Sequence, residues 1–387
     1  MTEVLLSDIC ELIVDCPHST AVDEGKGYPL VRTPNIGKGR LIYQGMHRVS
    51  EDIYLQRNKR ATPQEDDLIF AREATAGNVA LIQEGEKVCL GQRTVLIRPN
   101  KALVNPAFLT YFLLAPKQQY NLLSTANGAT VAHVNLPTIR NLKLELPNLD
   151  VQRRIAEVLS RYDALIENYQ RQIKLLEEAA QRLYKEWFVD LRFPGHQSTP
   201  IINTLPQSWQ KKKLGEILVF FDKKRKPLSS MQRMSMEKIF PYYGAATLMD
   251  YVDDYLFDGI YLLLGEDGTV ITPENYPVLQ YVWGKFWVNN HAHVLRGADG
   301  ISTEYLYMMF KEMPISDVVT GAAQPKISQG RLSEKSIILP SIELIQKWSS
   351  ITKPFFDSIR NKSEQIRNLS EARDRLLPKL MSAEIEV

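Results

Sequence analysis

The chain has 387 residues, a hydrophobic fraction of 44%, a charged fraction of 24% and a formal net charge of +2. This length suits two or three domains, and the composition is that of an ordinary folded protein. Neither an apolar run of the ~18–20 residues that a membrane span requires nor a signal-peptide pattern is found. Its three cysteines, Cys10, Cys16 and Cys89, have no disulfide or zinc-site spacing. We therefore expect a cytoplasmic protein.

The first part of the chain, residues 1–147, predicts a mixed α/β domain. Strands are expected at residues 68–71, 79–83 and 95–98, and a helix is expected at residues 106–115. The segment from Asn105 to Phe108 weakly resembles an amino-methyltransferase signature. It lacks the second proline of that signature, and no glycine-rich cofactor loop precedes it. The preferred interpretation is a helix start with Pro106 in the first turn.

A long amphipathic helix is predicted next, at about residues 151–187 within a helical arm at 148–192. Its apolar residues recur in steps of three and four, which is a heptad pattern with one stutter. Asp150 is the candidate N-cap. Such a helix would be about 55 Å long at 1.5 Å per residue and would need a partner for its apolar face. The expected seam residues are Ile155, Tyr162, Leu165, Ile173, Leu176 and Leu183.

The second part of the chain repeats this order. The Pro-, Ser- and Thr-rich segment 193–208 predicts a linker, residues 209–340 a second mixed domain, and residues 341–387 a second helical arm that starts at Ser341. Pro354 predicts either a kink in this arm or a helix that begins after it. Lys362 and Arg373 interrupt the apolar seam, and they either fix its register or contact a partner. The expected seam residues are Ile359, Ile366, Leu369 and Leu376.

The second domain has strands expected at residues 261–264 and 278–283 and a helix expected at residues 303–312. The second domain repeats short segments of the first at one constant spacing. Gly128-Ala129-Thr130 corresponds to Gly321-Ala322-Ala323, and Leu146-Pro147 corresponds to Leu339-Pro340. A repeat of about half the chain excludes a short-period solenoid. We therefore expect an α+β fold with two globular domains separated by two long helices, which pair as an intramolecular antiparallel coiled coil with a pseudo-two-fold repeat. The alternative is that each helix packs only on its own domain.

The sequence contains no GxxxxGK[ST], GxGxxG, GxSxG, HExxH or CxxC motif, so we expect a non-catalytic chain. His291 and His293 lie on one strand face but lack a local third ligand for a metal ion. Polar side chains of this kind suit donor–acceptor contacts with base edges, and lysines suit phosphates. Each of them also fits an ordinary solvated surface. The candidate DNA-binding residues are Arg32, Lys38, Arg40, Arg60, Arg72, Gln92 and Arg93 in the first domain and Lys223, Lys224, Arg225, Lys226, Lys285, Asn290, His291 and His293 in the second.

Five segments resemble the specificity subunit of type I restriction–modification systems. The first is GATVAHVNLP at residues 128–137, followed by the long first arm. The others are GEDG at 265–268, NNHAHVL at 289–295, GAAQPKIS at 321–328 and RLLPKLMSAEIEV at 375–387. They occur in the expected order and span nearly the whole chain.

The resemblance implies that each domain is a target-recognition domain for one half of a bipartite, asymmetric DNA site. It also implies that the arms set the spacing of the half-sites and dock two modification (methyltransferase) subunits, which restriction (translocase and nuclease) subunits join. The partners would bind S-adenosylmethionine, ATP and Mg and methylate adenine at N6 on a flipped base, whereas this chain would bind no cofactor. Three alternatives are an orphan specificity subunit or DNA-binding scaffold that partners another enzyme, a coiled-coil adaptor without a DNA role, and a single-chain restriction or methylating enzyme. The last would require the cofactor motifs that the sequence lacks.

Overall fold

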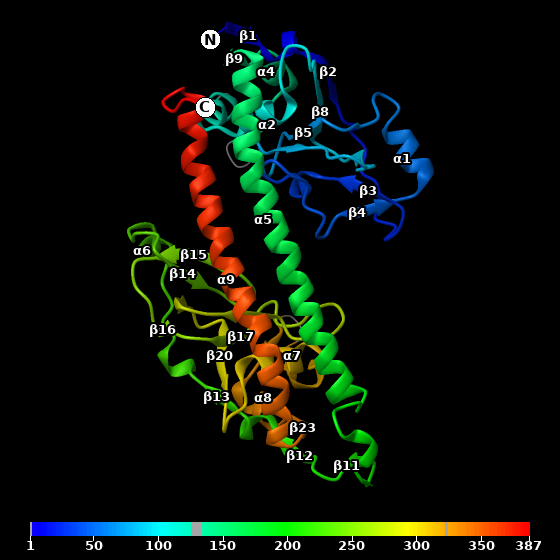
Figure 1. Ribbon diagram of the computed structural model, residues 1–387, viewed down its shortest axis with the longest axis vertical. Helices are drawn as coiled ribbons and strands as arrows, with labels where there is room; N and C mark the ends of the chain where they lie inside the picture. The colour runs from blue at the N-terminus through cyan, green and yellow to red at the C-terminus, as the bar shows by residue number, and fades with distance from the viewer. Residues whose placement is uncertain (1, 125–132, 322–323) are drawn as a thin grey trace. The chain divides into compact units, whose positions relative to one another are not determined.

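The computed structural model describes residues 2–124, 133–321 and 324–387 (Figure 1). It divides into two compact units: unit 1 consists of Met1–Asn168 and Ile366–Val387, and unit 2 consists of Tyr169–Gln365. Two long helices, α5 (Leu149–Tyr184) and α9 (Ile342–Met381), each contribute one part to unit 1 and one part to unit 2. We call residues 2–147 head 1 and residues 201–340 head 2. The repeat residues Gly128, Ala129, Thr130, Ala322 and Ala323 lie outside the described residues.

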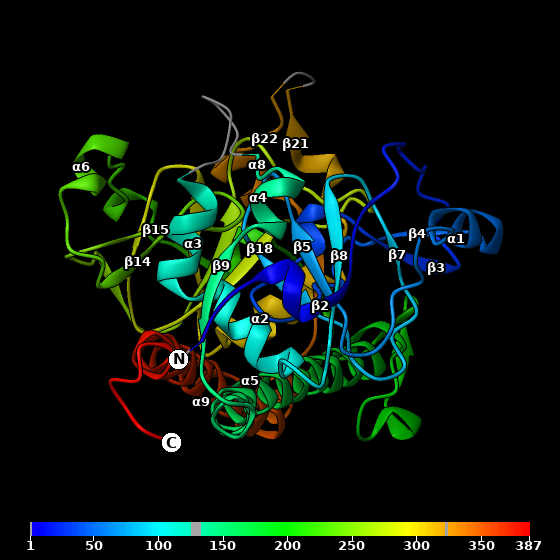
Figure 2. The same ribbon diagram turned by 90° about the horizontal axis from the view of Figure 1, so that it is seen from above.

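Head 1 is built on a four-stranded antiparallel sheet with the order β2-β8-β5-β6, of which β2, β8 and β5 are labelled in Figure 2. Side chains alternate between the two faces of β5. Leu68 and Phe70 pack with helix α2 in one apolar cluster, and Ile69 and Ala71 pack in a second cluster on the opposite face. The elements are β1 (Thr2–Leu5), β2 (Cys10–Asp15), β3 (Tyr28–Val31), β4 (His47–Val49), α1 (Glu51–Arg57), β5 (Leu68–Ala71), β6 (Val79–Leu81), β7 (Cys89–Leu90), β8 (Thr94–Pro99), α2 (Pro106–Leu114), α3 (Pro116–Leu123), α4 (Leu136–Arg140) and β9 (Lys143–Leu146).

Head 2 repeats this plan with the sheet order β13-β20-β17-β18. Its elements are β12 (Gln210–Lys213), β13 (Leu218–Phe220), α6 (Ser230–Met234), β14 (Phe240–Tyr243), β15 (Leu248–Val252), β16 (Phe257–Asp258), β17 (Tyr261–Gly265), β18 (Leu279–Val282), β19 (Lys285–Val288), β20 (Ala292–Gly297), α7 (Thr303–Lys311), β21 (Val319–Thr320), β22 (Lys326–Ile327), α8 (Gln329–Glu334) and β23 (Ser336–Leu339). The strands and helices predicted for both domains are confirmed, with ends that differ by at most two residues. Among the helices of the described residues, none combines the length and apolar character that crossing a membrane requires.

The two heads also share strand register at one end of the sheet, which allows the residues there to be matched. Ala71 lies opposite Thr94 in head 1, and Gly265 lies opposite Ala292 in head 2. The parallel pairs β3–β7 and β14–β19 agree, since Val31 lies opposite Leu90 and Tyr243 opposite Val288. The residues just outside these paired positions are therefore equivalent: Arg72 to Glu266, Glu73 to Asp267, Gln92 to Asn290 and Arg93 to His291.

Segments of α5 and α9 run antiparallel within each unit. In unit 1, Ile155 and Leu159 of α5 pack in one apolar cluster with Leu376 and Leu380 of α9. In unit 2, the cluster joins Ile173, Leu176 and Ala180 of α5 to Trp348, Phe356 and Ile359 of α9. The predicted pairing of two long helices is confirmed. The buried face is wider than a heptad seam because each head also covers it, which explains why Ala156 and Leu159 are buried although the seam omits them. Of the other seam residues, Tyr162, Ile366 and Leu369 are half-buried and Leu165 is exposed.

The two residues that interrupt the seam both contact the other helix. Arg373 forms an ion pair with Asp163 of α5 in unit 1, with a Nη1–Oδ1 distance of 2.5 Å. Lys362 lies 5.0 Å from the centre of the Tyr169 ring in unit 2. These contacts favour the first interpretation of the interruptions, in which they fix the register of the helix pair.

Two expectations about helix starts are corrected by the structure. Of the two alternatives for Pro354, a helix that begins after this residue is wrong: α9 runs continuously through it, because a proline removes only one backbone donor while the neighbouring Phe356 is buried in the core. The kink at Pro354 stays a prediction. The N-cap of α5 is Asn148 and not Asp150, since the Asn148 Oδ1 accepts a hydrogen bond from the Val151 amide at 3.0 Å. Ser341 is confirmed as a cap, because its Oγ accepts from the Leu344 amide at 3.3 Å. The expected linker contains a short hairpin, β10 (Ile201–Ile202) and β11 (Leu205–Pro206).

Candidate nucleic-acid interface

One end of the central sheet in each head gathers polar side chains from several strands. The carboxyl ends of β2 and β5 meet the amino end of β8, since both strands are antiparallel to β8. The corresponding place in head 2 lies at the ends of β13 and β17 and the start of β20. We call the group in head 1 cluster 1: Asp15, Arg72, Glu73, Arg93 and His133. Cluster 2 in head 2 consists of Asp222, Arg225, Glu266, Asp267, His291, His293 and Lys326.

Arg72 is the centre of cluster 1 and is only 8% exposed. Its Nε donates to the Val134 carbonyl at 2.9 Å, and its Nη1 donates to both carboxylate oxygens of Asp15 at 3.0 and 2.9 Å. Its Nη2 lies 2.8 Å from Nε2 of His133, whose Nδ1 lies 2.5 Å from the Glu73 carboxylate. Glu73 also forms an ion pair with Arg93. The buried guanidinium is thus paired and hydrogen-bonded, as burial of a charge requires.

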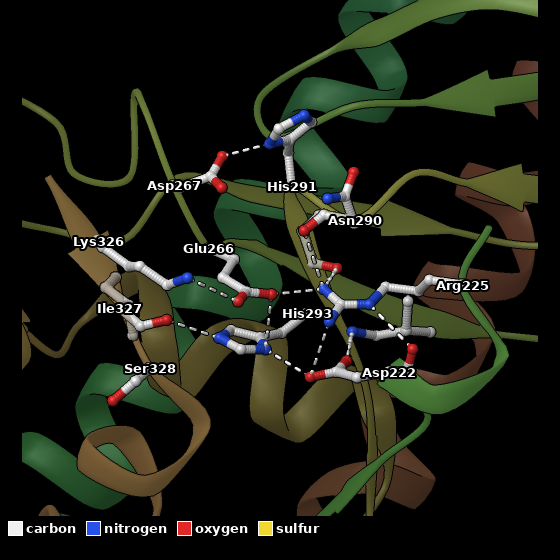
Figure 3. Close-up of polar contacts among 12 residues, drawn as sticks. Asp222, Arg225, Glu266, Asp267, Asn290, His291, His293, Lys326, Ile327 and Ser328 are labelled. Atoms are coloured by element: carbon white, nitrogen blue, oxygen red, sulfur yellow. Dashed lines mark hydrogen bonds and ion pairs between the residues drawn. The ribbon is translucent and has the colours of Figure 1, made fainter. Parts of the chain in front are cut away.

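His293 has the corresponding role in cluster 2 and is 1% exposed (Figure 3). Its Nδ1 lies 2.6 Å from Oδ2 of Asp222, and its Nε2 lies 2.8 Å from the Ile327 carbonyl. Arg225 donates from Nη1 to the Glu266 carboxylate at 2.6 Å and to the Ala292 carbonyl at 2.7 Å. Cluster 2 therefore places a histidine and an arginine beside two carboxylates.

In both clusters a buried side chain links a carboxylate to a backbone carbonyl, but the residue types differ. Val134 and Ile327 are equivalent, because their amides donate to the carbonyls of the equivalent residues Arg72 and Glu266. In head 1 an arginine links the Asp15 carboxylate to the Val134 carbonyl, and in head 2 a histidine links the Asp222 carboxylate to the Ile327 carbonyl. At the position of Arg72, head 2 has the opposite charge, Glu266, and Arg225 compensates that charge.

Three residues of cluster 2 have ligand atoms close enough to hold a metal ion: Asp222, Glu266 and His293 lie within 4.8 Å of one another. The Arg225 guanidinium contacts both carboxylates, at 2.6 Å from Glu266 and 3.6 Å from Asp222. A divalent cation bound there would meet this positive charge. The arrangement is that of a paired ionic network rather than a metal centre.

The structure brings seven of the predicted DNA-binding residues together at these sheet ends. Three of them, Arg72, Arg225 and His293, have partners inside their heads, as described above. The other four lie on the turns that lead into β8 and β20: Gln92 and Arg93 in head 1, and Asn290 and His291 in head 2. These two turns occupy equivalent positions, so the side chains that face solvent there are the strongest candidates for contacts with DNA.

The remaining predicted residues lie around these turns or further away. Lys223, Lys224 and Lys226 follow Asp222 directly and are exposed. The Arg60 Nη1 donates to the Asp15 carbonyl at 3.1 Å, next to cluster 1. Lys38 and Arg40 flank Gly39, which pairs with Ala80 on the edge strand β6, and the Arg32 Nη2 donates to the Gly45 carbonyl at 3.2 Å. Lys285 lies 4.5 Å from the centre of the Tyr255 ring.

Sequence reasoning missed the acidic members of the clusters and His133. The omitted residues are Asp15, Glu73, His133, Asp222, Glu266, Asp267 and Lys326. A signal was present, because Glu266 and Asp267 form the centre of the GEDG segment and His133 and Lys326 fall at matching positions of the repeat. An acidic residue is not expected at a surface for DNA, so residue type alone does not indicate these positions.

The chain is similar to one well-defined group of proteins. Residues 1–178 and 206–370 match a family model described as the type I restriction modification DNA specificity domain. The type I restriction enzyme MjaIX specificity subunit of Methanocaldococcus jannaschii is 25% identical over 99% of this chain and 93% of its own length. A putative specificity subunit of Haemophilus influenzae, S.HindORF215P, is 34% identical over 34% of each chain. The crystal structure of the type I restriction–modification S subunit from M. genitalium shares the fold, with a TM-score of 0.55, 18% identity and coverage of 98% of this chain and 95% of that chain.

Proposed function

This chain belongs to the family of type I restriction–modification specificity subunits, and from that premise we propose that its two heads read the two halves of one bipartite, asymmetric DNA sequence. One observation carries the proposal. The heads share strand register, yet the equivalent turns present Gln92 and Arg93 in head 1 and Asn290 and His291 in head 2. Arg93, Asn290 and His291 are exposed, whereas Gln92 is half-buried and its Nε2 donates to the His18 carbonyl at 2.8 Å. Different hydrogen-bonding groups on one scaffold read different bases. Two such heads on one chain produce an asymmetric site, whereas a homodimer favours a palindrome.

The long helices support a role in spacing and assembly. Helices α5 and α9 have 36 and 40 residues, and each takes part in both units. A continuous helix is stiff over this length, so it suits an element that sets the separation of two half-sites. In this proposal the helices also dock two modification subunits, one for each copy of the repeat, and restriction subunits join the same assembly.

The chemistry belongs to the partners in this proposal. The modification subunits bind S-adenosylmethionine and transfer its methyl group to N6 of an adenine that is flipped out of the duplex. The restriction subunits use ATP and Mg. The specificity chain contributes sequence recognition and no catalytic group, and the assembly acts on DNA in the cytoplasm.

Co-expression with the cognate modification subunits tests the proposal. Long-read sequencing that detects modified bases should show N6-methyladenine at one split motif in the genome of the expressing cells. Cells that express the modification subunits alone are the control and should lack this motif. If the same methylation appears without the chain, or if no split motif appears with it, the proposal is wrong.

A further inference from the structure

The exposed turn of each head is tied to a carboxylate at an equivalent position. In head 1 the Arg93 guanidinium forms an ion pair with Glu73. In head 2 the Nδ1 of His291 lies 2.5 Å from Oδ1 of Asp267 (Figure 3). Register makes Glu73 equivalent to Asp267 and Arg93 equivalent to His291. The residue types differ at both positions, but the pairing of an acid with a basic tip is the same.

In both pairs the acidic side chain is more buried than its basic partner. The side chains of Glu73 and Asp267 are 16% and 22% exposed, while those of Arg93 and His291 are 62% and 48% exposed. Each carboxylate therefore holds one nitrogen of its partner from the protein side. The rest of the guanidinium or imidazole is exposed to solvent, and the contact with the carboxylate restricts its direction.

The acids are themselves anchored. Glu73 lies 2.5 Å from Nδ1 of His133, which contacts the buried Arg72. Asp267 forms a backbone bridge with Lys326, and the next amide, of Gly268, donates to the Pro325 carbonyl at 3.0 Å. Each acid thus connects the exposed turn to the core of its head.

The backbone of the turns is fixed as well. Arg93 has a φ of +62°, a left-handed conformation that is uncommon for a residue other than glycine. Its carbonyl accepts from the Arg72 amide at 2.9 Å, and the His291 carbonyl accepts from the equivalent Glu266 amide at 2.9 Å. The Asn289 side chain also accepts from the His291 amide at 2.9 Å. A strained residue persists where surrounding contacts determine it, and such positions concentrate at functional sites.

We propose that Glu73 and Asp267 are equivalent positioning residues, which hold Arg93 and His291 as base-contacting side chains of the two half-sites. This inference rests on the proposed function. A phosphate contact needs positive charge and tolerates a flexible lysine, whereas a base contact needs donors or acceptors in a defined direction. An acidic partner lowers the net positive charge at the tip but fixes its direction. The pairing therefore suits base edges better than phosphates.

The substitutions Glu73→Gln and Asp267→Asn test the proposal in the chain assembled with its modification subunits. The affinity for duplexes with the cognate site and with single base changes in either half is measured at several salt concentrations. We expect Glu73→Gln to reduce discrimination about tenfold or more in one half-site only, and Asp267→Asn to do so in the other, which is the range for one directed base contact. The matched controls are Asp66→Asn and Asp317→Asn, which remove acids paired with Lys101 and Lys335 elsewhere in each head. Discrimination should be unchanged in both controls.

Further variants separate base contact from phosphate contact and from misfolding. Arg93→Lys keeps the charge but loses the planar group, so it should relax the same half-site as Glu73→Gln, and Glu73→Asp should restore part of the discrimination. If Arg93→Ala and His291→Ala weaken all duplexes equally and lower the salt dependence, these side chains contact phosphates and the inference is wrong. It is also wrong if Arg93→Lys relaxes a half-site while a folded Glu73→Gln variant keeps full discrimination. A wild-type chain that directs no split-site recognition would instead contradict the proposed function.

Discussion

Asp163 illustrates how much one buried side chain holds together in unit 1. It is buried in α5, accepts a hydrogen bond from the Tyr111 hydroxyl at 2.5 Å, and pairs with Arg373 of α9 at 2.5 Å. Burial and the nearby Asp163 carboxylate raise the pKa of Tyr111, so the phenol remains a donor over the whole neutral range. One carboxylate thus joins head 1 to both helices.

Replacement of this residue should be costly. Asp163→Ala removes the acceptor of the Tyr111 hydroxyl and leaves the largely buried Arg373 guanidinium with only the exposed Asp374 as partner, and we expect the free energy of unfolding to fall by about 3 kcal/mol. Chemical denaturation measures the change. Asp150→Ala is the control, because its pair with Arg153 is exposed and should contribute little. Equal stability of both variants would contradict the structural role of Asp163.

Residue roles were harder to predict from the sequence than residue locations. The turn residues Gln92, Arg93, Asn290 and His291 were predicted as one kind of site, and the structure places them at equivalent turns. The sequence does not show that Arg72 and His293 point into their heads, because their partners Asp15 and Asp222 are distant in the chain. Burial and pairing depend on tertiary contacts, which residue type alone does not determine.

At the level of secondary structure, the apolar periodicity predicted both long helices, and the departures have different causes. Asn148 replaces Asp150 as the N-cap because the α5 helix starts at Leu149. Helix α9 tolerates Pro354 although proline is unfavourable inside a helix. The cap is thus a local effect, whereas the continuity of α9 through Pro354 depends on core packing, in which the neighbouring Phe356 is buried.

The proline in α9 leads to a stability prediction. Proline is about 3 kcal/mol less favourable than alanine in a helix interior, and loss of its effect on the unfolded chain offsets up to about 1 kcal/mol of the gain. We therefore expect Pro354→Ala to raise the free energy of unfolding by about 2 kcal/mol. Calorimetry or denaturant titration measures it, with the exposed helix substitution Glu371→Ala as the control. A decrease in stability would show that α9 needs the proline where it is.

For the whole molecule, the repeat predicts that specificity is modular. Exchange of residues 1–147 for the head of a related chain should change one half of the recognised sequence and leave the other half unchanged. The incoming head must keep two contacts with α5: the Asn105 amide donates to the Gln152 side chain at 2.9 Å, and the Tyr111 hydroxyl donates to Asp163. Sequencing of modified bases measures both halves. The reciprocal exchange of residues 209–340 should alter only the other half, and a change in both halves after either exchange would contradict modular reading.

The opposite charges at the equivalent positions Arg72 and Glu266 also constrain how such chains diversify by recombination. A crossover between the two copies of the repeat at a point inside a head would produce a hybrid head. One hybrid would combine Arg72 with Arg225, and the other would combine Glu266 with Asp15, the acidic partner of Arg72. Either hybrid would leave like charges together in a buried place. A crossover within α5 or α9 keeps every charged cluster intact. We therefore expect natural recombinants of such chains to have their breakpoints in the long helices, so that new DNA specificities arise by reassortment of entire heads.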